Sequence, residues 1–269
     1  LVLEGVAFAR LILSTGAAGP GAGVGGGVLA LLAAAMLVML GGISVGRPPH
    51  GVVSAVLVHL AVVGQGLLGG SRVLANQGAL AFLHGAMAQL VYAAIAALVV
   101  TSSPRWESGP GQRGPDAAGL RGRSLLALVL VYAQIVVGAW LRHTGRGDAL
   151  GLHVVLAVLS GGALLLRVRA LGRAALASDP MFRKLRHWIL STSIAQIGLG
   201  LLTTFAIFML SGGFHAAVSV TEAVAATAHV ATGALLLACT LAAVLWSQRC
   251  LRPNREQVAH RTELVEQHA

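Results

Sequence analysis

Residues 188–210 read WILSTSIAQIGLGLLTTFAIFML, a run of 23 residues without a single Asp, Glu, Lys or Arg. A helix of this length measures about 35 Å, enough to cross the ~30 Å hydrocarbon core of a bilayer. Only a helix satisfies its own backbone in lipid over such a run, and the alternating ten-residue segments of a membrane barrel are not present. The run therefore predicts a transmembrane helix.

Runs of the same kind recur along the chain and are separated by segments rich in proline, glycine and arginine. They cover residues 24–45, 51–69, 80–100, 124–141, 150–166, 188–210 and 223–247. The whole chain is 56% apolar and only 10% charged, whereas a soluble domain carries about 25% charge. We therefore expect an all-α, polytopic membrane helix bundle with seven clear transmembrane helices, and the composition excludes a soluble domain.

The cationic residues divide unequally between alternate loops. Fifteen Lys and Arg fall on one side, and only Arg72, Arg142 and Arg146 fall on the other. By the positive-inside rule, the side with fifteen is cytoplasmic and includes the C-terminus. The net charge of +10 does not indicate nucleic-acid binding, because the arginines lie at the ends of apolar runs and not on a face with aromatic stacking groups.

The two cysteines, Cys239 and Cys250, are too few for a disulfide framework or a zinc site, and we expect them to stay reduced. No cleavable signal peptide is recognisable. The expected organisation has five parts: a truncated or degenerate N-terminal segment (1–23), an N-terminal helical half (24–101), a cytoplasmic linker (102–122), a C-terminal four-helix half (123–247) and a cytoplasmic tail (248–269).

A three-residue pattern is repeated along the chain. A glutamine is followed four residues later by a glycine, and a histidine opens the next span; the three sets are Gln65, Gly69 and His84; Gln134, Gly138 and His153; and Gln196, Gly200 and His229. Glutamine and histidine are 19 residues apart in the first two sets and 33 in the third. Helix packing explains the first two members, since glycine allows close approach and glutamine bonds across the contact.

The three histidines are predicted to lie at one depth, near the non-cytoplasmic ends of alternate helices. Ionisable groups inside a membrane are expensive and usually functional, although a packed, hydrogen-bonded histidine is the alternative for each. Imidazoles that face each other from separate helices are typical axial ligands of haem iron. Zinc or copper needs three or four ligands, and only Glu222 accompanies the histidines; it either steers a proton or is a helix-start carboxylate.

Three further residues are candidates for the site. Arg72 and Arg142 end their spans on the side where cations are rare, which suits the carboxylates of a haem; ordinary interfacial arginines are the alternative. His59 lies within a span, six residues before Gln65. We expect His59 to be a buried histidine bonded to a backbone carbonyl, with a ligand role as the alternative.

Five segments carry a resemblance to a known family: QGLLGGSRVL (65–74), LHG (83–85) with Gln89 following, QIVVGAWLRHT (134–144), LH (152–153) and AHVATGA (228–234). Taken together, over residues 45–249, they resemble the haem A synthase family of cytochrome oxidase assembly proteins. That family has eight transmembrane helices in two four-helix halves, with a histidine on each even-numbered helix.

The resemblance implies that a b-type haem lies between His153 and His229, and that His84 is a catalytic residue and an iron ligand on the side of the substrate, haem O. It also implies oxidation of a methyl group of haem O to a formyl group. The expected location is a bacterial cytoplasmic membrane, and the expected partners are haem O synthase or terminal oxidase assembly factors.

One family feature is absent from the sequence. The family's second helix carries a Glu-x-x-His-Arg type stretch that supplies the remaining ligand on the substrate side, whereas no histidine precedes His50 here. A non-catalytic haem b-binding or electron-transfer membrane protein is therefore the second hypothesis. A small-molecule transporter is the third, because internal repeats are common in transporters, but the spans show no broken helix or charged midplane site.

Overall fold

The computed structural model describes residues 51–108, 117–173, 179–214 and 216–250. Within these ranges the chain is helical and contains no strand, and six helices are long and apolar enough to cross a membrane. The predicted all-α membrane helix bundle is thereby confirmed. The predicted span 24–45, the segment 1–23 and most of the tail lie outside the described residues.

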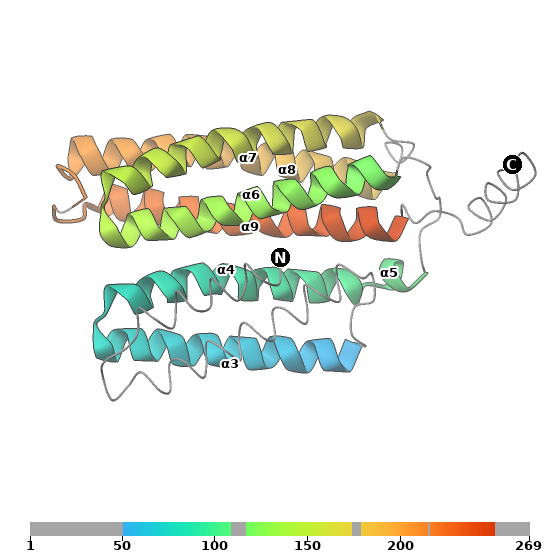
Figure 1. The fold of residues 1–269 in the computed structure, drawn as a ribbon, viewed down its shortest axis with the longest axis horizontal. Helices are drawn as coiled ribbons and strands as arrows, with labels where there is room; N and C mark the ends of the chain where they lie inside the picture. Colours follow the sequence, from blue (N-terminus) through green and yellow to red (C-terminus); the bar gives the residue numbers. More distant parts are fainter. Residues whose placement is uncertain (1–50, 109–116, 174–178, 215, 251–269) are drawn as a thin grey trace, which may run out of the picture. The chain divides into compact units, whose positions relative to one another are not determined.

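The chain divides into two compact units, unit 1 (Leu1–Leu98) and unit 2 (Val99–Ala269). The division falls near the end of α4, close to the boundary that the sequence predicts after residue 101. The described part of unit 1 consists of α3 (Gly51–Ala75) and most of α4 (Gly78–Thr101), which run side by side (Figure 1). Ala61 of α3 packs with Met87 and Val91 of α4.

Unit 2 is a four-helix bundle formed by α6 (Ala117–Thr144), α7 (Gly147–Arg173), α8 (Pro180–Phe205) and α9 (Val220–Cys250). Helix α6 packs against α7 and α9, and α8 packs against the same two helices (Figure 1). Helices α7 and α9 therefore lie diagonally opposite each other. This arrangement directs one stripe of each helix into a shared interior.

Two hairpin turns, one between α3 and α4 and one between α6 and α7, match in sequence position. Asn76 lies eleven residues after Gln65, and Gly145 lies eleven residues after Gln134. Both residues adopt positive φ, 46° and 62°, and both donate a backbone hydrogen bond to the carbonyl four residues before. The repeat therefore includes the helix end as well as the glutamine, glycine and histidine.

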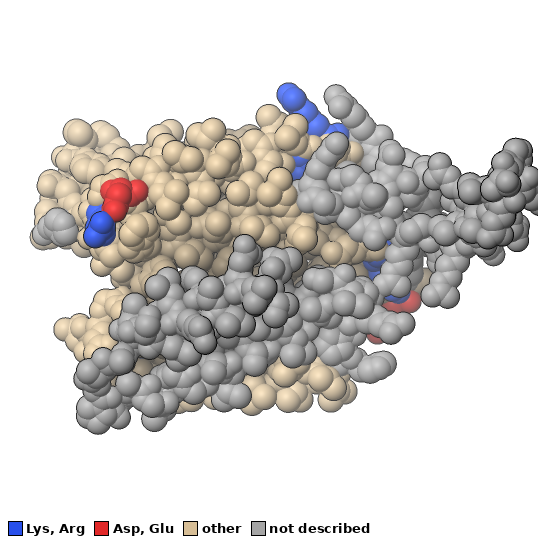
Figure 2. All heavy atoms as spheres, in the orientation of Figure 1, with Lys and Arg blue, Asp and Glu red and all other residues tan. Residues whose placement is uncertain are grey.

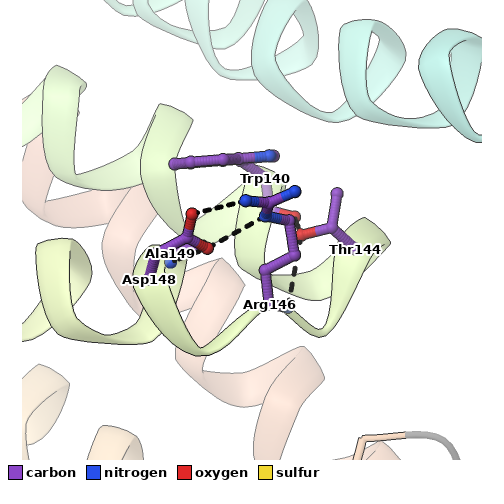
Figure 3. Close-up of polar contacts among 5 residues, drawn as sticks. All are labelled: Trp140, Thr144, Arg146, Asp148 and Ala149. Carbon is purple, nitrogen blue, oxygen red and sulfur yellow. Dashed lines mark hydrogen bonds and ion pairs between the residues drawn. The ribbon is translucent and has the colours of Figure 1, made fainter.

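The turn between α6 and α7 also carries an exposed ion pair (Figure 3). Arg146 donates through Nε and Nη2 to the two carboxylate oxygens of Asp148, at 3.0 and 2.7 Å. Asp148 in turn accepts from the backbone N–H of Ala149 at 2.9 Å. On the face of unit 2 seen in Figure 2, charged side chains lie only near the two ends of the helices, with an uncharged stretch between them.

Helix α8 begins at Pro180, in the segment between the predicted spans 150–166 and 188–210. Asp179 caps its N-terminus by accepting from the N–H of Met181 at 2.8 Å, and Pro180 fills the first helical position. At the other end the helix continues as the π-helix η2 (Ala206–Leu210), after which Gly212 and Gly213 adopt φ of +84° and +113°. Only glycine adopts such values readily, so this chain reversal depends on both residues.

The linker predicted over residues 102–122 is partly helical. A short helix, α5 (Pro104–Ser108), lies within it, and α6 already begins at Ala117. Helix α5 is held against α9 by Arg249, which donates through Nε and Nη2 to the carbonyl of Trp106, and by edge contact of the Trp106 and Trp246 rings at 5.0 Å. Arg105 adds an ion pair to Asp179 at 2.6 Å.

Arg167 is the first residue after the predicted span 150–166, so it was counted among the fifteen loop cations. The structure places it within α7 instead, where it is only 1% exposed. Its guanidinium donates to the carbonyl of Ala243 at 2.9 Å and to Oγ of Ser247 at 2.6 Å, both on α9. These bonds replace the water that the cation would otherwise need, and they join the two diagonal helices.

Candidate functional site

Each of the three repeated glutamines contacts the histidine of the next helix. The amide nitrogen of Gln65 lies 2.9 Å from Nδ1 of His84, that of Gln134 lies 3.2 Å from Nε2 of His153, and that of Gln196 lies 3.2 Å from Nε2 of His229. The contact is made across a hairpin in every case, although the third loop is 14 residues longer (33 against 19). The glutamines therefore bond across the helix contact as expected, but the prediction did not name the histidines as their partners; the repeated spacing of 19 residues was the signal for them.

The repeated glycines provide the space in which the histidine rings lie. A Cβ at Gly69, Gly138 or Gly200 would approach Cε1 of the paired histidine to 2.9, 2.8 or 3.1 Å, closer than an ordinary contact. Neighbouring glycines such as Gly70 and Gly198 have nothing within 4 Å of such a Cβ. Each imidazole therefore lies directly against the backbone of the preceding helix.

In unit 2 the structure brings two imidazoles together. The rings of His153 and His229, which we call the histidine pair, have centroids 6.4 Å apart and planes inclined at 69°. They come from the diagonal helices α7 and α9, and both side chains are half-buried. Two imidazoles that bind one metal ion from opposite sides, with bonds of about 2 Å, have centroids about 6 Å apart. The separation therefore suits two imidazoles that bind the same metal ion.

Polar atoms around the histidine pair lack partners. Nδ1 of His153, Nδ1 of His229 and the Oε1 atoms of Gln134 and Gln196 are buried and make no hydrogen bond. Leaving such an atom unpaired costs about 1–3 kcal/mol, and unpaired buried groups are rare in native proteins. Four in one place indicate a site that a bound group completes.

The arrangement in unit 1 is different. The amide nitrogen of Gln65 donates to the backbone carbonyl of His84 at 2.8 Å as well as facing its ring, and Oε1 of Gln65 is buried without a partner. The other histidine described in this unit, His59, is exposed. The expectation that His59 is buried is therefore wrong, because it lies off the buried row of α3 that includes Val58 and Ala61.

The remaining candidates lie nearer the helix ends. The side chains of Arg72 and Arg142 are exposed in the last turns of α3 and α6. Glu222 is half-buried in the first turn of α9, where its N–H donates to Oγ of Ser219. That position favours the helix-start carboxylate over a proton-steering group.

The donor set does not suit zinc. Within the part of the chain that the structure describes, no three His, Cys, Asp or Glu side chains come together to hold a metal ion. Cys239 is a free, half-buried thiol on α9. The site thus offers a metal two imidazoles, which is the number that an octahedral iron already bound by four porphyrin nitrogens requires.

Comparison with known proteins identifies no relative: no family model, no curated protein and no solved structure matches the chain.

Proposed function

We propose that the protein is a haem-dependent membrane oxidoreductase of the haem A synthase type, in which His153 and His229 hold a haem b within unit 2. The observation that carries the proposal is the histidine pair, whose ring centroids are 6.4 Å apart and whose Nδ1 atoms are buried without partners. The three segments of sequence resemblance in unit 2 (134–144, 152–153 and 228–234) support the choice of haem.

The chain's own residues suit a haem ligand in three respects. Each imidazole has one nitrogen without a partner and the other beside a glutamine amide. Neither amide nitrogen has a second partner among the described residues, so each amide can turn to present Oε1 as the acceptor that a ligand histidine needs for its other N–H. Gly138 and Gly200 leave room for the rings. The exposed guanidiniums of Arg72 and Arg142 are available to bind carboxylates at the helix ends.

A bound haem would supply one-electron redox chemistry. The helices would position the macrocycle, and the surrounding apolar side chains would exclude water. In this proposal, unit 1 meets the substrate haem O through His84, and the reaction converts a methyl group to a formyl group. The excess of cations in alternate loops supports a cytoplasmic C-terminus.

The haem assignment is tested by a reduced-minus-oxidised absorption spectrum of the full chain purified with haem. We expect a low-spin signal that is lost in His153→Ala and in His229→Ala. His187→Ala is the matched control, because His187 lies on α8 of the same unit with an exposed side chain. A signal that survives in both of the first two variants contradicts the proposal.

A non-catalytic haem b-binding or electron-transfer protein is the second candidate. It is favoured by unit 1, where His84 is half-buried and the other described histidine, His59, is exposed. Pigment extraction after supply of haem O separates the two functions. Formation of haem A supports the enzyme, whereas unconverted haem O beside a loaded haem b site supports the second candidate.

A further inference from the structure

We propose that Gln65 is a positioning residue that holds His84 in the tautomer with its hydrogen on Nε2, so that His84 offers a hydrogen-bond donor and not a metal ligand. The tautomer follows from the contacts in unit 1 alone. Its meaning for a bound porphyrin rests on the proposed function.

The orientation of the Gln65 amide is decided by the backbone. The carbonyl oxygen of His84 can only accept a hydrogen bond, so the amide atom 2.8 Å from it is the nitrogen. The opposite orientation would place Oε1 against that carbonyl and join two acceptors. The Oε1 atom instead points to a place where it has no partner.

The same nitrogen decides which atom of the imidazole carries the hydrogen. It lies 2.9 Å from Nδ1 of His84, and an amide NH₂ has two hydrogens, one for the carbonyl and one for the ring. Nδ1 is therefore the acceptor. Because a neutral imidazole has one acceptor and one donor nitrogen, the hydrogen is on Nε2.

The backbone of α3 restricts the movement of the His84 ring. Gly69 lies so close that a Cβ there would be 2.9 Å from Cε1 of His84, which places the ring against the backbone of α3. Turning the ring over would put a carbon opposite the amide and lose the bond. The position of the ring and the identity of its donor nitrogen are therefore both set by α3.

A histidine that binds a metal needs the reverse arrangement. Its ligating nitrogen has a free lone pair, and its other N–H donates to an acceptor. Gln65 presents a donor where an acceptor is needed. The Nε2–H of His84 suits an oxygen acceptor, and Arg72, seven residues after Gln65 and so on nearly the same face of α3, favours a negatively charged one such as a carboxylate.

The tautomer is measured directly by ¹⁵N NMR of the full chain in lipid nanodiscs, with ¹⁵N-labelled histidine and His84→Ala for assignment. We expect a pyridine-type signal from Nδ1 of His84 and a pyrrole-type signal from Nε2. The reverse pattern in the wild-type chain overturns the inference without any variant having to fold.

Gln65→Glu provides the second test. A protonated carboxyl group at this position donates to the carbonyl of His84 and accepts from Nδ1–H, so we expect the two signal types to exchange. Unchanged signals in this variant count against the positioning role. Because the haem signal depends on unit 2, it should persist in Gln65→Glu; its absence from the wild-type chain would refute the proposed function and leave the tautomer assignment standing.

Discussion

The hairpin α3–α4 of unit 1 and the hairpin α6–α7 of unit 2 are built on the same pattern but end in different sites. Both place a histidine ring on a glycine and beside a glutamine. In unit 1 the glutamine is also bonded to a backbone carbonyl, and it faces Nδ1. In unit 2 it faces Nε2, and Nδ1 is left buried without a partner.

The difference arises from what lies opposite the hairpin. In unit 2 a second hairpin, α8–α9, brings the ring of His229 to 6.4 Å from that of His153. The described part of unit 1 has one hairpin with a single half-buried histidine, His84. A repeated motif therefore supplies one oriented imidazole, and the assembly of two such hairpins is needed to make a two-imidazole site.

The largest expected effect comes from adding a methyl group under a ring. Gly138→Ala places a Cβ 2.8 Å from Cε1 of His153, so the ring must move, and overpacking of this kind costs about 1–3 kcal/mol. We expect haem affinity to fall by up to about 100-fold, because 1.4 kcal/mol corresponds to about tenfold. Haem titration followed by absorbance measures the change.

Two controls sharpen the comparison of the units. Gly161→Ala, on α7, meets nothing within 4 Å and should leave haem affinity unchanged. Gly69→Ala disturbs His84 in the same way that Gly138→Ala disturbs His153, but it should leave the haem b of unit 2 in place. If Gly69→Ala lowers haem b affinity as much as Gly138→Ala, the separation of the two sites is wrong.

The next effect tests the glutamines. Gln134→Leu keeps the size of the side chain but removes the polar partner of His153, and loss of such a partner lowers metal affinity by about 10- to 100-fold. We expect about tenfold weaker haem binding and a changed midpoint potential in a redox titration. Gln65→Leu removes the equivalent group in unit 1 and should change neither quantity; equal effects in the two variants would contradict the assignment of haem b to unit 2.

The positions of the described helices could be predicted from the sequence because uncharged runs mark lipid-spanning segments directly. The helices extend past the predicted runs, because a helix can continue into water where its charged residues are solvated. Arg167 shows the limit of this approach. Its charge marks the end of a run, yet its partners are an oxygen of Ser247 and a carbonyl 76 residues away, and such long-range partners leave no local signal.

The candidate site could be predicted only in part. The matching positions of the histidines were visible, but which histidines face each other depends on the diagonal order of four helices, which no spacing reports. The glutamines were expected to bond across a helix contact, but not to a particular ring, because an amide in a helix gives no sign of the partner that it will meet. The exposure of His59 likewise depends on which face of α3 packs against α4.

A third prediction concerns stability, and it should affect unit 2 alone. Ser247→Ala removes one of the oxygen atoms to which the buried guanidinium of Arg167 donates, so we expect a loss of about 1–3 kcal/mol. Hydrogen–deuterium exchange should show faster exchange in α7 and α9 and no change in α3 and α4. Thr227→Ala is the control on α9, because that hydroxyl is exposed and bonds only to its own helix; equal effects of the two variants would show that the bond to Arg167 contributes nothing.

The smallest expected effect lies in the two matched turns, where unit 1 has Asn76 and unit 2 has Gly145, both at positive φ. Glycine and asparagine are the residues that adopt this conformation most readily, so exchanging them should shift unfolding by only about 0.5 kcal/mol in either direction. Gly145→Val should cost about 1–2 kcal/mol instead, since its Cβ clashes with the following carbonyl oxygen. Thermal unfolding in detergent measures all three variants. If Gly145→Asn destabilises the protein as strongly as Gly145→Val, the two turns are not equivalent, and the repeat ends at the histidines.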